Sequence, residues 1–354
     1  VDALGDLRIT PDELEYLRGI RYLHPSYVDA LKRFRLDPSD VEIGTDGAFS
    51  LRVQGNWYAT ILFEVPVLAI INEVYFRHTH PFTPEMEAEG RKRLKEKCQL
   101  VKEATDVTLF NLVEFGTRRR YSREWQAQVL ETLQQELPQS LIGTSNVFHA
   151  KRLGLPPFGT MAHEFLQACQ AFTALPDFQK YALEAWMREY RGDLGIALSD
   201  VVGMNAFLRD FDKLFSKAYD GARHDSGDPY EWGEKLIAHY QKWGIDPKTK
   251  FAVWSDALTI PKALDLARAF QGRINTSFGV GTNLTNDLGF EPLSIVIKMT
   301  RCDGRPVAKL SDSAGKAMAG DDVYLAYLRQ TFQIESPPTT SDAAPRRLGG
   351  KAAL

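Results

Sequence analysis

From residue 107 onward, short apolar runs alternate with stretches of helical spacing, and this alternation is the clearest pattern in the chain. Apolar residues at helical spacing fill several of the stretches between the runs, as in 207–215, 232–243 and 261–270. Strands that alternate with helices are typical of a parallel sheet, so we predict an α/β fold whose residues 107–299 form an irregular (β/α) TIM-like barrel. Eight runs have the length and composition of buried strands: 109–115, 140–143, 157–160, 194–199, 221–224, 251–254, 274–278 and 294–299.

Residues 1–106 have a different, mixed pattern. Residues 14–36 show helical spacing after the start signal Thr10-Pro11, with a break at Pro25, and residues 86–103 are typical of a charged helix. We therefore expect an N-terminal α+β domain over 1–106, with residues 300–334 packing on it. Residues 335–354 are rich in Pro, Ala and Gly and are expected to form a solvated tail. Short strands are predicted at 41–43, 49–53 and 58–63.

Polar or glycine-rich clusters directly follow seven of the strand-like runs. The carboxyl ends of parallel strands lie at the same edge of a sheet, and barrel enzymes keep their active sites there. Each cluster alone is compatible with ordinary turn chemistry, but together they favour an enzyme over a packing scaffold. The clusters are 116–120, 143–146, 159–164, 199–200, 223–228, 255–256 and 279–283.

The charges in these clusters indicate a polyphosphate substrate. Arginine guanidinium groups bind phosphate or carboxylate through paired N–H donors, and aspartate oxygens are ligands that Mg²⁺ prefers. The alternatives are that the arginines form a solvated surface and that Asp200 and Asp256 cap the helices that follow them. The arginines are Arg118, Arg119, Arg120 and Arg223, and the aspartates are Asp200, Asp225, Asp228 and Asp256.

Two further features suit phosphate chemistry. The turn Gly279-Val280-Gly281-Thr282 follows the seventh run, where barrels often hold a phosphate on backbone N–H groups. His163 follows Gly159-Thr160 and could be a general base, a metal ligand, a phosphate acceptor or a structural histidine. The sequence has no GxxxxGK[ST], HExxH or GxSxG motif, which argues against a P-loop, a zincin and an α/β-hydrolase.

Composition narrows the class of protein. The 354 residues carry 43 basic and 46 acidic side chains, and this net charge of −3 argues against a nucleic-acid-binding protein. No apolar run in the sequence approaches the roughly 20 residues of a membrane helix, so we expect no membrane partner. Three separated cysteines, Cys98, Cys169 and Cys302, exclude a CxxC-type metal site and indicate a reducing, cytoplasmic location.

The motifs in these clusters resemble those of bacterial nicotinate phosphoribosyltransferases. The resemblance implies an ATP-hydrolysing, ligase-type enzyme of NAD salvage that makes nicotinate mononucleotide from nicotinate and phosphoribosyl pyrophosphate. It also implies ATP as a co-substrate, Mg²⁺ as the cofactor, a phosphorylated histidine and a homodimer with shared active sites. The matching segments are FGTRRRYSRE (115–124), GTSN (143–146), GTMAHE (159–164), RHDSGDPYEWGEK (223–235), SFGVGTNL (277–284) and AKLSDS (308–313).

Catalytic and phosphate-binding roles follow from the resemblance at the matching positions. His163 of GTMAHE corresponds to the phosphorylated histidine, and Asp200 would orient its imidazole. Asp225 would hold the ribose hydroxyls, and Asp228 would bind Mg²⁺ on the pyrophosphate side. Phosphate groups would be bound by Arg119, Gly279, Gly281 and Thr282.

The resemblance also implies a nicotinate pocket. Arg118 would pack against the pyridine ring, and Arg223 and Ser145 would contact the carboxylate, with Thr144 beside them. Nicotinamide-using relatives have Asp in place of Ser145. Because a carboxylate accepts from an amide but repels an acid, serine favours nicotinate. The family's N-terminal TDxYKxxM-type segment is absent, so we expect the chain to begin inside the family pattern.

Two other functions are compatible with the motifs. A quinolinate-type phosphoribosyltransferase would use a similar barrel without ATP coupling or a phosphohistidine, and would need more basic residues for a second carboxylate. A catalytically silent barrel could act as a binding protein. Phosphate on His163 after incubation with ATP would identify the first function, and turnover of quinolinate would separate the other two.

Overall fold

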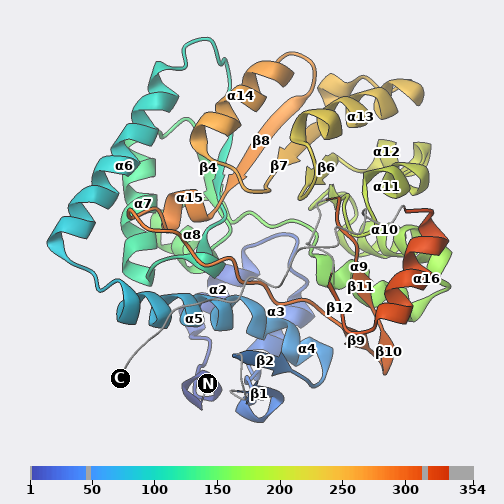
Figure 1. Cartoon of the computed structure of the whole chain (residues 1–354), viewed down its shortest axis with the longest axis horizontal. Helices are drawn as coiled ribbons and strands as arrows, with labels where there is room; N and C mark the ends of the chain where they lie inside the picture. The colour runs from blue at the N-terminus through green and yellow to red at the C-terminus, as the bar shows by residue number, and fades with distance from the viewer. Residues whose placement is uncertain (1, 45–48, 313–317, 335–354) are drawn as a thin grey trace, which may run out of the picture.

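A six-stranded parallel β-sheet forms the centre of the molecule (Figure 1). The computed structural model describes residues 2–44, 49–312 and 318–334. The strand order in the sheet is β4-β3-β8-β7-β6-β5, and neighbouring strands are parallel throughout. The strands are β3 (Leu112–Glu114), β4 (Leu141–Thr144), β5 (Ile196–Leu198), β6 (Gly221–His224), β7 (Phe251–Trp254) and β8 (Asn275–Val280).

Helices connect consecutive strands and cover the sheet (Figure 1). Large aromatic side chains fill the interior between these layers, and the rings of Trp254 and Phe278 stack with their centroids 5.7 Å apart. The alternation of strands and helices confirms the predicted α/β fold. The helices are α7 (Arg123–Glu136), α8 (Val147–Leu153), α9 (His163–Phe172), α10 (Phe178–Tyr190), α11 (Met204–Asp210), α12 (Lys213–Ala218), α13 (Pro229–Lys242), α14 (Ile260–Phe270) and α15 (Thr282–Thr285), with short 3₁₀ turns η3 (Thr117–Arg119), η4 (Leu175–Asp177) and η5 (Pro247–Thr249).

Two of the eight predicted strands do not form. The 157–160 run contributes only one isolated bridge, between Pro157 and Thr144, since a proline has no N–H to donate to a ladder. The 294–299 run is not a strand, because its carbonyls accept from side chains instead: Arg119 donates to Ile295 at 3.1 Å and Gln167 to Met299 at 2.7 Å. Within the described residues the sheet therefore ends at β4 and β5, and closure into a barrel stays a prediction.

The N-terminal region consists of helices and one antiparallel hairpin. The predicted helix 14–36 is two helices separated before Pro25, the strands predicted at 41–43 and 49–53 form the hairpin, and the helix predicted at 86–103 is present. The elements are α1 (Asp2–Gly5), α2 (Pro11–Arg18), α3 (Pro25–Leu31), η1 (Pro38–Asp40), β1 (Val41–Gly44), β2 (Ser50–Val53), α4 (Trp57–Thr60), η2 (Ile61–Phe63), α5 (Glu64–Thr79) and α6 (Pro84–Glu103).

Side-chain caps decide two local structures, and the first of them contradicts a predicted strand. Residues 58–63 are helical rather than extended, because the Asn56 side chain accepts from the Tyr58 N–H and begins α4. The stretch 207–215 contains two helices rather than one. The Asp212 side chain accepts from the N–H groups of Leu214 and Phe215 and so begins α12.

The C-terminal segment returns past the sheet. β9 (Arg301–Cys302) pairs with β10 (Arg305–Pro306), β11 (Ala308–Lys309) pairs with β12 (Met318–Ala319), and α16 (Asp322–Phe332) follows. The Leu310 N–H donates to the Val201 carbonyl at 2.8 Å, which places β11 beside the loop after β5. The domain boundaries at 106 and 299 and the packing of 300–334 stay predictions, and the predicted tail 335–354 lies outside the described residues.

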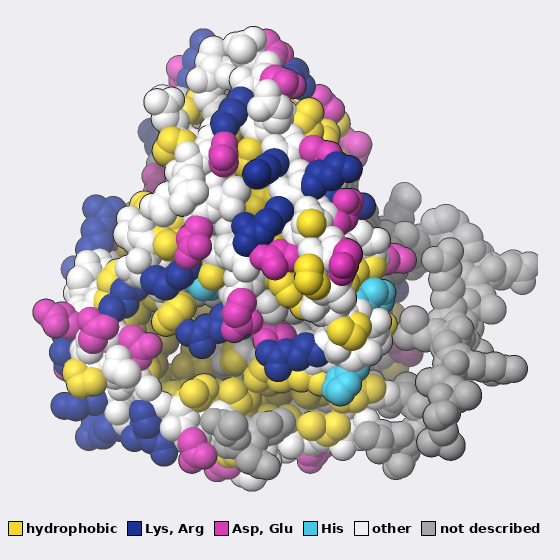
Figure 2. All heavy atoms as spheres, turned by 90° about the vertical axis from the view of Figure 1, so that its left-hand side faces the viewer, with side chains coloured by type: hydrophobic (Ala, Val, Ile, Leu, Met, Phe, Trp, Pro, Cys, Tyr) yellow, Lys and Arg dark blue, Asp and Glu magenta, His cyan; other side chains and the backbone are white. Residues whose placement is uncertain are grey.

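The stretch Trp57–Thr79 is long and apolar enough, by length and composition, to cross a membrane. In the sequence, Glu64, Pro66 and Glu73 divide this stretch into short apolar runs, so none of the runs by itself predicts a membrane helix. One such stretch is weak evidence for a membrane span. Figure 2 shows apolar side chains gathered along the lower part of one face of the molecule. Exposed apolar residues on this stretch are Tyr58, Ile61, Val65, Ile70, Val74 and Tyr75.

Candidate active site

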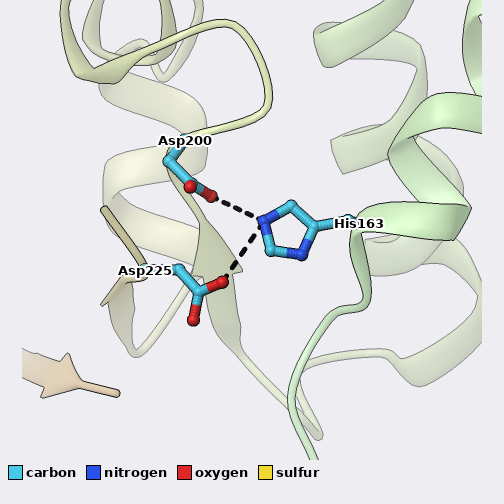
Figure 3. Close-up of side chains that lie close together, drawn as sticks. All are labelled: His163, Asp200 and Asp225. Carbon is cyan, nitrogen blue, oxygen red and sulfur yellow. Dashed lines mark hydrogen bonds and ion pairs between the residues drawn. The ribbon is translucent and has the colours of Figure 1, made fainter. Parts of the chain in front are cut away.

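A histidine and two aspartates meet at the carboxyl end of the sheet (Figure 3). His163 is the first residue of α9, Asp200 follows β5, and Asp225 follows β6. His163 Nε2 lies 2.8 Å from Asp200 Oδ1 and 3.4 Å from Asp225 Oδ2. The fold thus brings together the three residues predicted to be catalytic, although they come from three separate loops. We call them the His163 cluster.

Asp200 is a buried, ionised carboxylate and not a helix cap. Its Oδ2 pairs with Lys309 Nζ at 2.8 Å and accepts from Ser226 Oγ at 2.7 Å. Burial alone would raise the pKa of Asp200, but its contacts with His163 and Lys309 outweigh burial and hold that pKa well below the usual range. The alternative that Asp200 caps the next helix is wrong, because Gly203 occupies the N-cap position of α11.

His163 is a neutral imidazole at physiological pH. Burial lowers its pKa to about 4, and this effect exceeds the opposing attraction of Asp200. Since ionised Asp200 has no proton to give, the His163 Nε2–H is the donor between them. Nδ1 therefore carries the lone pair, and it faces Lys298 Nζ at 3.4 Å. The arrangement presents a nitrogen nucleophile beside a cation.

Two lysines lie beside the His163 cluster, Lys309 buried and Lys298 partly buried, and the sequence alone assigned neither of them a role. Lys309 lies in the AKLSDS segment, and Lys298 lies in the run predicted to be the eighth strand. Burial, and next the charge of Lys309, lowers the pKa of Lys298 to about 8. A lysine that ends the apolar run Ile295-Val296-Ile297 was the only local indication that the segment carries a buried charge.

Arg223 is fixed beside the cluster by contacts on both arms of its guanidinium group. Nη1 donates to Asp225 Oδ1 at 2.8 Å and to Ser255 Oγ at 3.1 Å, and Nη2 donates to the Met161 carbonyl at 3.1 Å. Burial alone would raise the pKa of Asp225, but the charges of Arg223, His163 and Lys309 together outweigh burial and lower that pKa. The buried Arg223 Nε has no hydrogen-bond partner among the described residues and can donate to a ligand.

The three consecutive arginines after β3 point to different partners. Arg118 Nη1 pairs with Glu64 Oε1 of α5 at 2.7 Å, and 43% of its side chain is exposed. Arg119 donates through Nε to the Ile295 carbonyl, and burial lowers its pKa. Arg120 donates to Gln126 Oε1 at 3.0 Å and faces inward. The alternative of a uniformly solvated arginine surface is therefore wrong.

The GTSN segment (143–146) contains one buried and one exposed side chain among the predicted substrate contacts. Thr144 is buried and its Oγ1 donates to Glu114 Oε2 at 2.6 Å, whereas Ser145 is exposed at the end of β4. The described residues show no hydrogen bond between the side chains of Ser145 and Arg223. The substrate-binding roles of Thr144 and Ser145 stay predictions.

Comparison with known proteins decides the family. A model described as the nicotinate phosphoribosyltransferase (NAPRTase) family matches residues 110–336, and one described as the NAPRTase N-terminal domain matches residues 1–72. The chain belongs to the nicotinate phosphoribosyltransferase family. This confirms the resemblance that the motifs indicated.

Nicotinate phosphoribosyltransferases of several bacteria are similar to this chain over most of its length. The Burkholderia mallei enzyme is 54% identical over 343 residues, which are 96% of this chain and 86% of the relative. The Bordetella pertussis enzyme is 55% identical over 342 residues, with 96% and 84% covered. The crystal structure of the Vibrio cholerae enzyme superposes with a TM-score of 0.91 at 42% identity, and the match covers 95% of this chain and 82% of that one.

In this member of the nicotinate phosphoribosyltransferase family, the loop after β8 packs against the end of β3. A Cβ atom on Gly279 would lie 2.5 Å from the Phe115 ring, and one on Gly281 would lie 3.0 Å from the Phe115 carbonyl oxygen. Both glycines therefore permit close approach of two loops. Thr282 begins the short helix α15 at this point. Phosphate binding by these residues stays a prediction.

Asp228 caps the helix that follows it. Its Oδ1 accepts from the N–H groups of Tyr230 and Glu231 at the start of α13, at 2.9 and 2.8 Å. The side chain is exposed. These hydrogen bonds orient the carboxylate, so its capping role is compatible with its predicted contact to Mg²⁺.

The donor atoms of the His163 cluster lie within 4.8 Å of one another, a spacing that could hold a metal ion. The charges of its two carboxylates are already compensated, however, since Asp200 pairs with Lys309 and Asp225 with Arg223. A third nearby cation is Lys298. This surplus of protein cations suits an anionic phosphoryl group better than a divalent cation.

Proposed function

We propose that this chain is an ATP-coupled, ligase-type nicotinate phosphoribosyltransferase that makes nicotinate mononucleotide in NAD salvage. Its substrates would be nicotinate, phosphoribosyl pyrophosphate and ATP, and His163 would carry the phosphoryl group of ATP. The observation that carries the proposal is the neutral His163 imidazole, held at Nε2 by Asp200 and facing Lys298 at Nδ1, in a chain of this family.

Phosphoryl transfer would begin at the Nδ1 lone pair of His163. The N–P bond forms as the bond between the γ-phosphorus of ATP and its bridging oxygen breaks, and ADP leaves. No proton has to leave the ring first, because Nε2–H is already bonded to ionised Asp200, which stabilises the positive charge that develops on the ring. Lys298 beside Nδ1 would offset the negative charge of the phosphoryl group.

Glycosyl transfer would need positioning more than covalent help. The ring nitrogen of nicotinate displaces pyrophosphate at the anomeric carbon of the ribose through an oxocarbenium-like transition state, and oriented charges stabilise it. Arg118 would lie against the pyridine ring, Arg223 and Ser145 would contact its carboxylate, and Asp225 would hold the ribose hydroxyls. Hydrolysis of phospho-His163 would then favour product formation and return the free imidazole.

Phosphate groups and Mg²⁺ would be bound at the rim of the same site. Arg119 and the loop of Gly279, Gly281 and Thr282 would bind phosphate, and Asp228 would contact the Mg²⁺ that accompanies pyrophosphate. The oriented, exposed Asp228 carboxylate fits this role because Mg²⁺ prefers oxygen ligands. When bound, the ion would neutralise charge on the departing pyrophosphate.

Two arrangements implied by the family accompany this proposal. The sheet together with 157–162 would act as an incomplete barrel, with its mouth at the His163 cluster. A homodimer would cover the exposed apolar residues of Trp57–Thr79, such as Val65 and Val74, and this apolar face supports a second copy as the partner. We place the enzyme in the cytoplasm, where its substrates for NAD salvage would be available.

The proposed function is tested by the product and by the modified residue. The purified chain is incubated with nicotinate, phosphoribosyl pyrophosphate and MgATP, and nicotinate mononucleotide is measured by chromatography. Peptide mass spectrometry under conditions that preserve phosphohistidine should locate the phosphate on His163. Turnover of quinolinate without ATP would favour the quinolinate-type alternative, and no turnover of either acid would favour a silent binding protein.

Ser145→Asp is expected to lower the rate with nicotinate about tenfold to a hundredfold and to produce a small rate with nicotinamide. A carboxylate at this position repels the nicotinate carboxylate and accepts from the amide NH₂. Arg223 limits the gain, because it can pair with the new aspartate. Initial rates with each substrate at fixed phosphoribosyl pyrophosphate provide the measurement, with Ser145→Asn as a neutral control. An unchanged preference for the acid would mean that Ser145 does not contact the carboxylate.

Phosphorylation of His163 is expected to slow as pH rises through about 8, which is the lowered pKa of Lys298. Above this pH the Lys298 amine loses its proton, so it no longer offsets the phosphoryl charge. Lys298→Arg keeps its charge across this range, so its alkaline decline should disappear. The measurement is single-turnover phosphorylation at neutral and alkaline pH, with Lys180→Arg, at an exposed position of α10, as the control. A decline that persists in Lys298→Arg would assign it to another group.

A further inference from the structure

A fully buried carboxylate outside the His163 cluster joins the two loops that carry the proposed nicotinate contacts. Glu114 is the last residue of β3 and is 0% exposed. Its Oε1 accepts from the Gly116 N–H, and its Oε2 accepts from Thr144 Oγ1 at 2.6 Å. Gln126 Nε2 of α7 lies 3.1 Å from both carboxylate oxygens. One side chain therefore holds the loop after β3, the end of β4 and a helix.

Further hydrogen bonds connect these three elements to one another. Gln126 Nε2 donates to Thr117 Oγ1 at 2.8 Å, and Gln126 Oε1 accepts from Arg120 Nη1 at 3.0 Å. Asn146 Nδ2 donates to Thr117 Oγ1 at 3.1 Å. We call the connected residues the Glu114 network; they are Glu114, Gly116, Thr117, Arg120, Gln126, Thr144 and Asn146.

The Glu114 network flanks two of the proposed nicotinate contacts on both sides. Arg118 lies between Thr117 and Arg120 in the chain, and Ser145 lies between Thr144 and Asn146. The side chain of neither Arg118 nor Ser145 contacts the Glu114 carboxylate in the described structure. Any effect of Glu114 on nicotinate must therefore pass through the placement of the two loops.

The hydrogen bonds around Glu114 suit a carboxylate and no other side chain of its size. Every partner donates: a backbone N–H, an amide NH₂ and the Thr144 hydroxyl. The Thr144 hydroxyl already accepts from the Asn146 N–H at 3.0 Å, so its own proton is directed to Glu114. Burial raises the pKa of Glu114, and the hydrogen bonds from Thr144, Gly116 and Gln126 offset only part of that rise. A glutamine would present an NH₂ group to one of these donors.

We propose that Glu114 is a positioning residue that sets the preference for nicotinate over nicotinamide by fixing Arg118 and Ser145 relative to each other. The inference rests on the proposed function, in which these two side chains contact nicotinate. Acid and amide differ only at the carboxylate end of the ring, so a small displacement of the two loops changes their discrimination. In the proposed function, phosphoribosyl pyrophosphate would contact mainly the loops after β6 and β8, and Arg119 would be its one contact in the loop after β3, so its binding should depend less on Glu114.

The test is Glu114→Gln, compared with wild type for both substrates. The KM for nicotinate is expected to rise about tenfold, and the ratio of kcat/KM for nicotinate over nicotinamide to fall by a similar factor. The KM for phosphoribosyl pyrophosphate should change by less than about threefold. Asp210→Asn is the matched control. Asp210 is the last residue of α11, and its buried carboxylate accepts a hydrogen bond from Gln179 Nε2 at 2.7 Å. It should lower thermal stability without changing the acid-to-amide ratio.

A second variant keeps the test decisive if Glu114→Gln does not fold. Gln126→Met removes the amide that contacts Glu114 and Thr117, and it should weaken the acid-to-amide preference in the same direction. The inference is overturned if a folded variant keeps the wild-type ratio, or if the KM values for nicotinate and phosphoribosyl pyrophosphate rise by the same factor. Failure of wild type to use nicotinate would instead contradict the proposed function, so the two failures are distinguishable.

Discussion

Replacing His163 with alanine is expected to abolish nicotinate-dependent ATP hydrolysis while leaving slow, uncoupled synthesis of nicotinate mononucleotide. The reason is that the proposed phosphate acceptor is Nδ1 of this imidazole, whereas the proposed glycosyl transfer would use Arg118, Arg223 and Asp225. Removing the nucleophile of a covalent mechanism costs about 10⁴-fold or more in rate. Phosphate release and nucleotide formation, measured in the same reaction, separate the two activities.

His239→Gln is a suitable control for this experiment. His239 lies on α13, outside the His163 cluster, and is also buried. Its Nε2 lies 2.6 Å from the Phe211 carbonyl oxygen. Its replacement should leave the ratio of ATP hydrolysed to nucleotide formed unchanged. Full ATP hydrolysis by folded His163→Ala would show that another residue accepts the phosphate.

Asp200→Asn is expected to slow phosphorylation of His163 by about 10²- to 10⁴-fold. Lys309 Nζ and Ser226 Oγ both contact Oδ2 as donors, so the carbonyl oxygen of an asparagine would face them. The asparagine NH₂ would then face His163 Nε2, which would have to become an acceptor. The imidazole would change tautomer, with its proton on Nδ1, and would lose the lone pair that attacks ATP.

Rapid-quench measurement of phospho-His163 formation tests this expectation, since it does not depend on later steps. Asp210→Asn carries the same chemical change at a buried site away from the cluster, so it controls for the loss of a buried charge. Thermal unfolding of both variants checks that they fold. A wild-type phosphorylation rate in folded Asp200→Asn would mean that Asp200 does not set the tautomer of His163.

The central strands could be predicted from the sequence because their environment is simple. The runs 221–224 and 251–254 coincide with β6 and β7, which have paired neighbours on both sides and are mostly buried. The runs 157–160 and 294–299 have similar composition but do not form strands. Whether an apolar run pairs depends on which distant segment reaches it, and local composition does not contain that information.

The residues of the candidate site also fall into two groups, those that the sequence pattern could predict and those that it could not. His163, Asp200 and Asp225 follow strand-like runs, so the predicted topology placed them at one edge of the sheet, whereas the contact between His163 and Asp200 was implied by the family resemblance. Lys309 and Glu114 had no such marker, because nothing in a short window shows that a lysine will be buried against an aspartate or that a glutamate will join two loops. Their roles depend on contacts with residues far away in the chain, such as Lys309 with Asp200 and Glu114 with Thr144.

The position in the chain of the two lysines beside the His163 cluster has a consequence for synthesis of the protein. Lys298 and Lys309 come from the segment after β8, whereas their partners His163 and Asp200 precede β6. Chains fold from the N-terminus as they leave the ribosome, so the sheet can assemble before these lysines emerge. Until they dock, Asp200 lacks its ion pair with Lys309, and His163 Nδ1 lacks its contact with Lys298. A nascent chain with a finished sheet would therefore still lack both lysines of the proposed phosphorylation site, and that site would be completed only by the segment that follows the sheet.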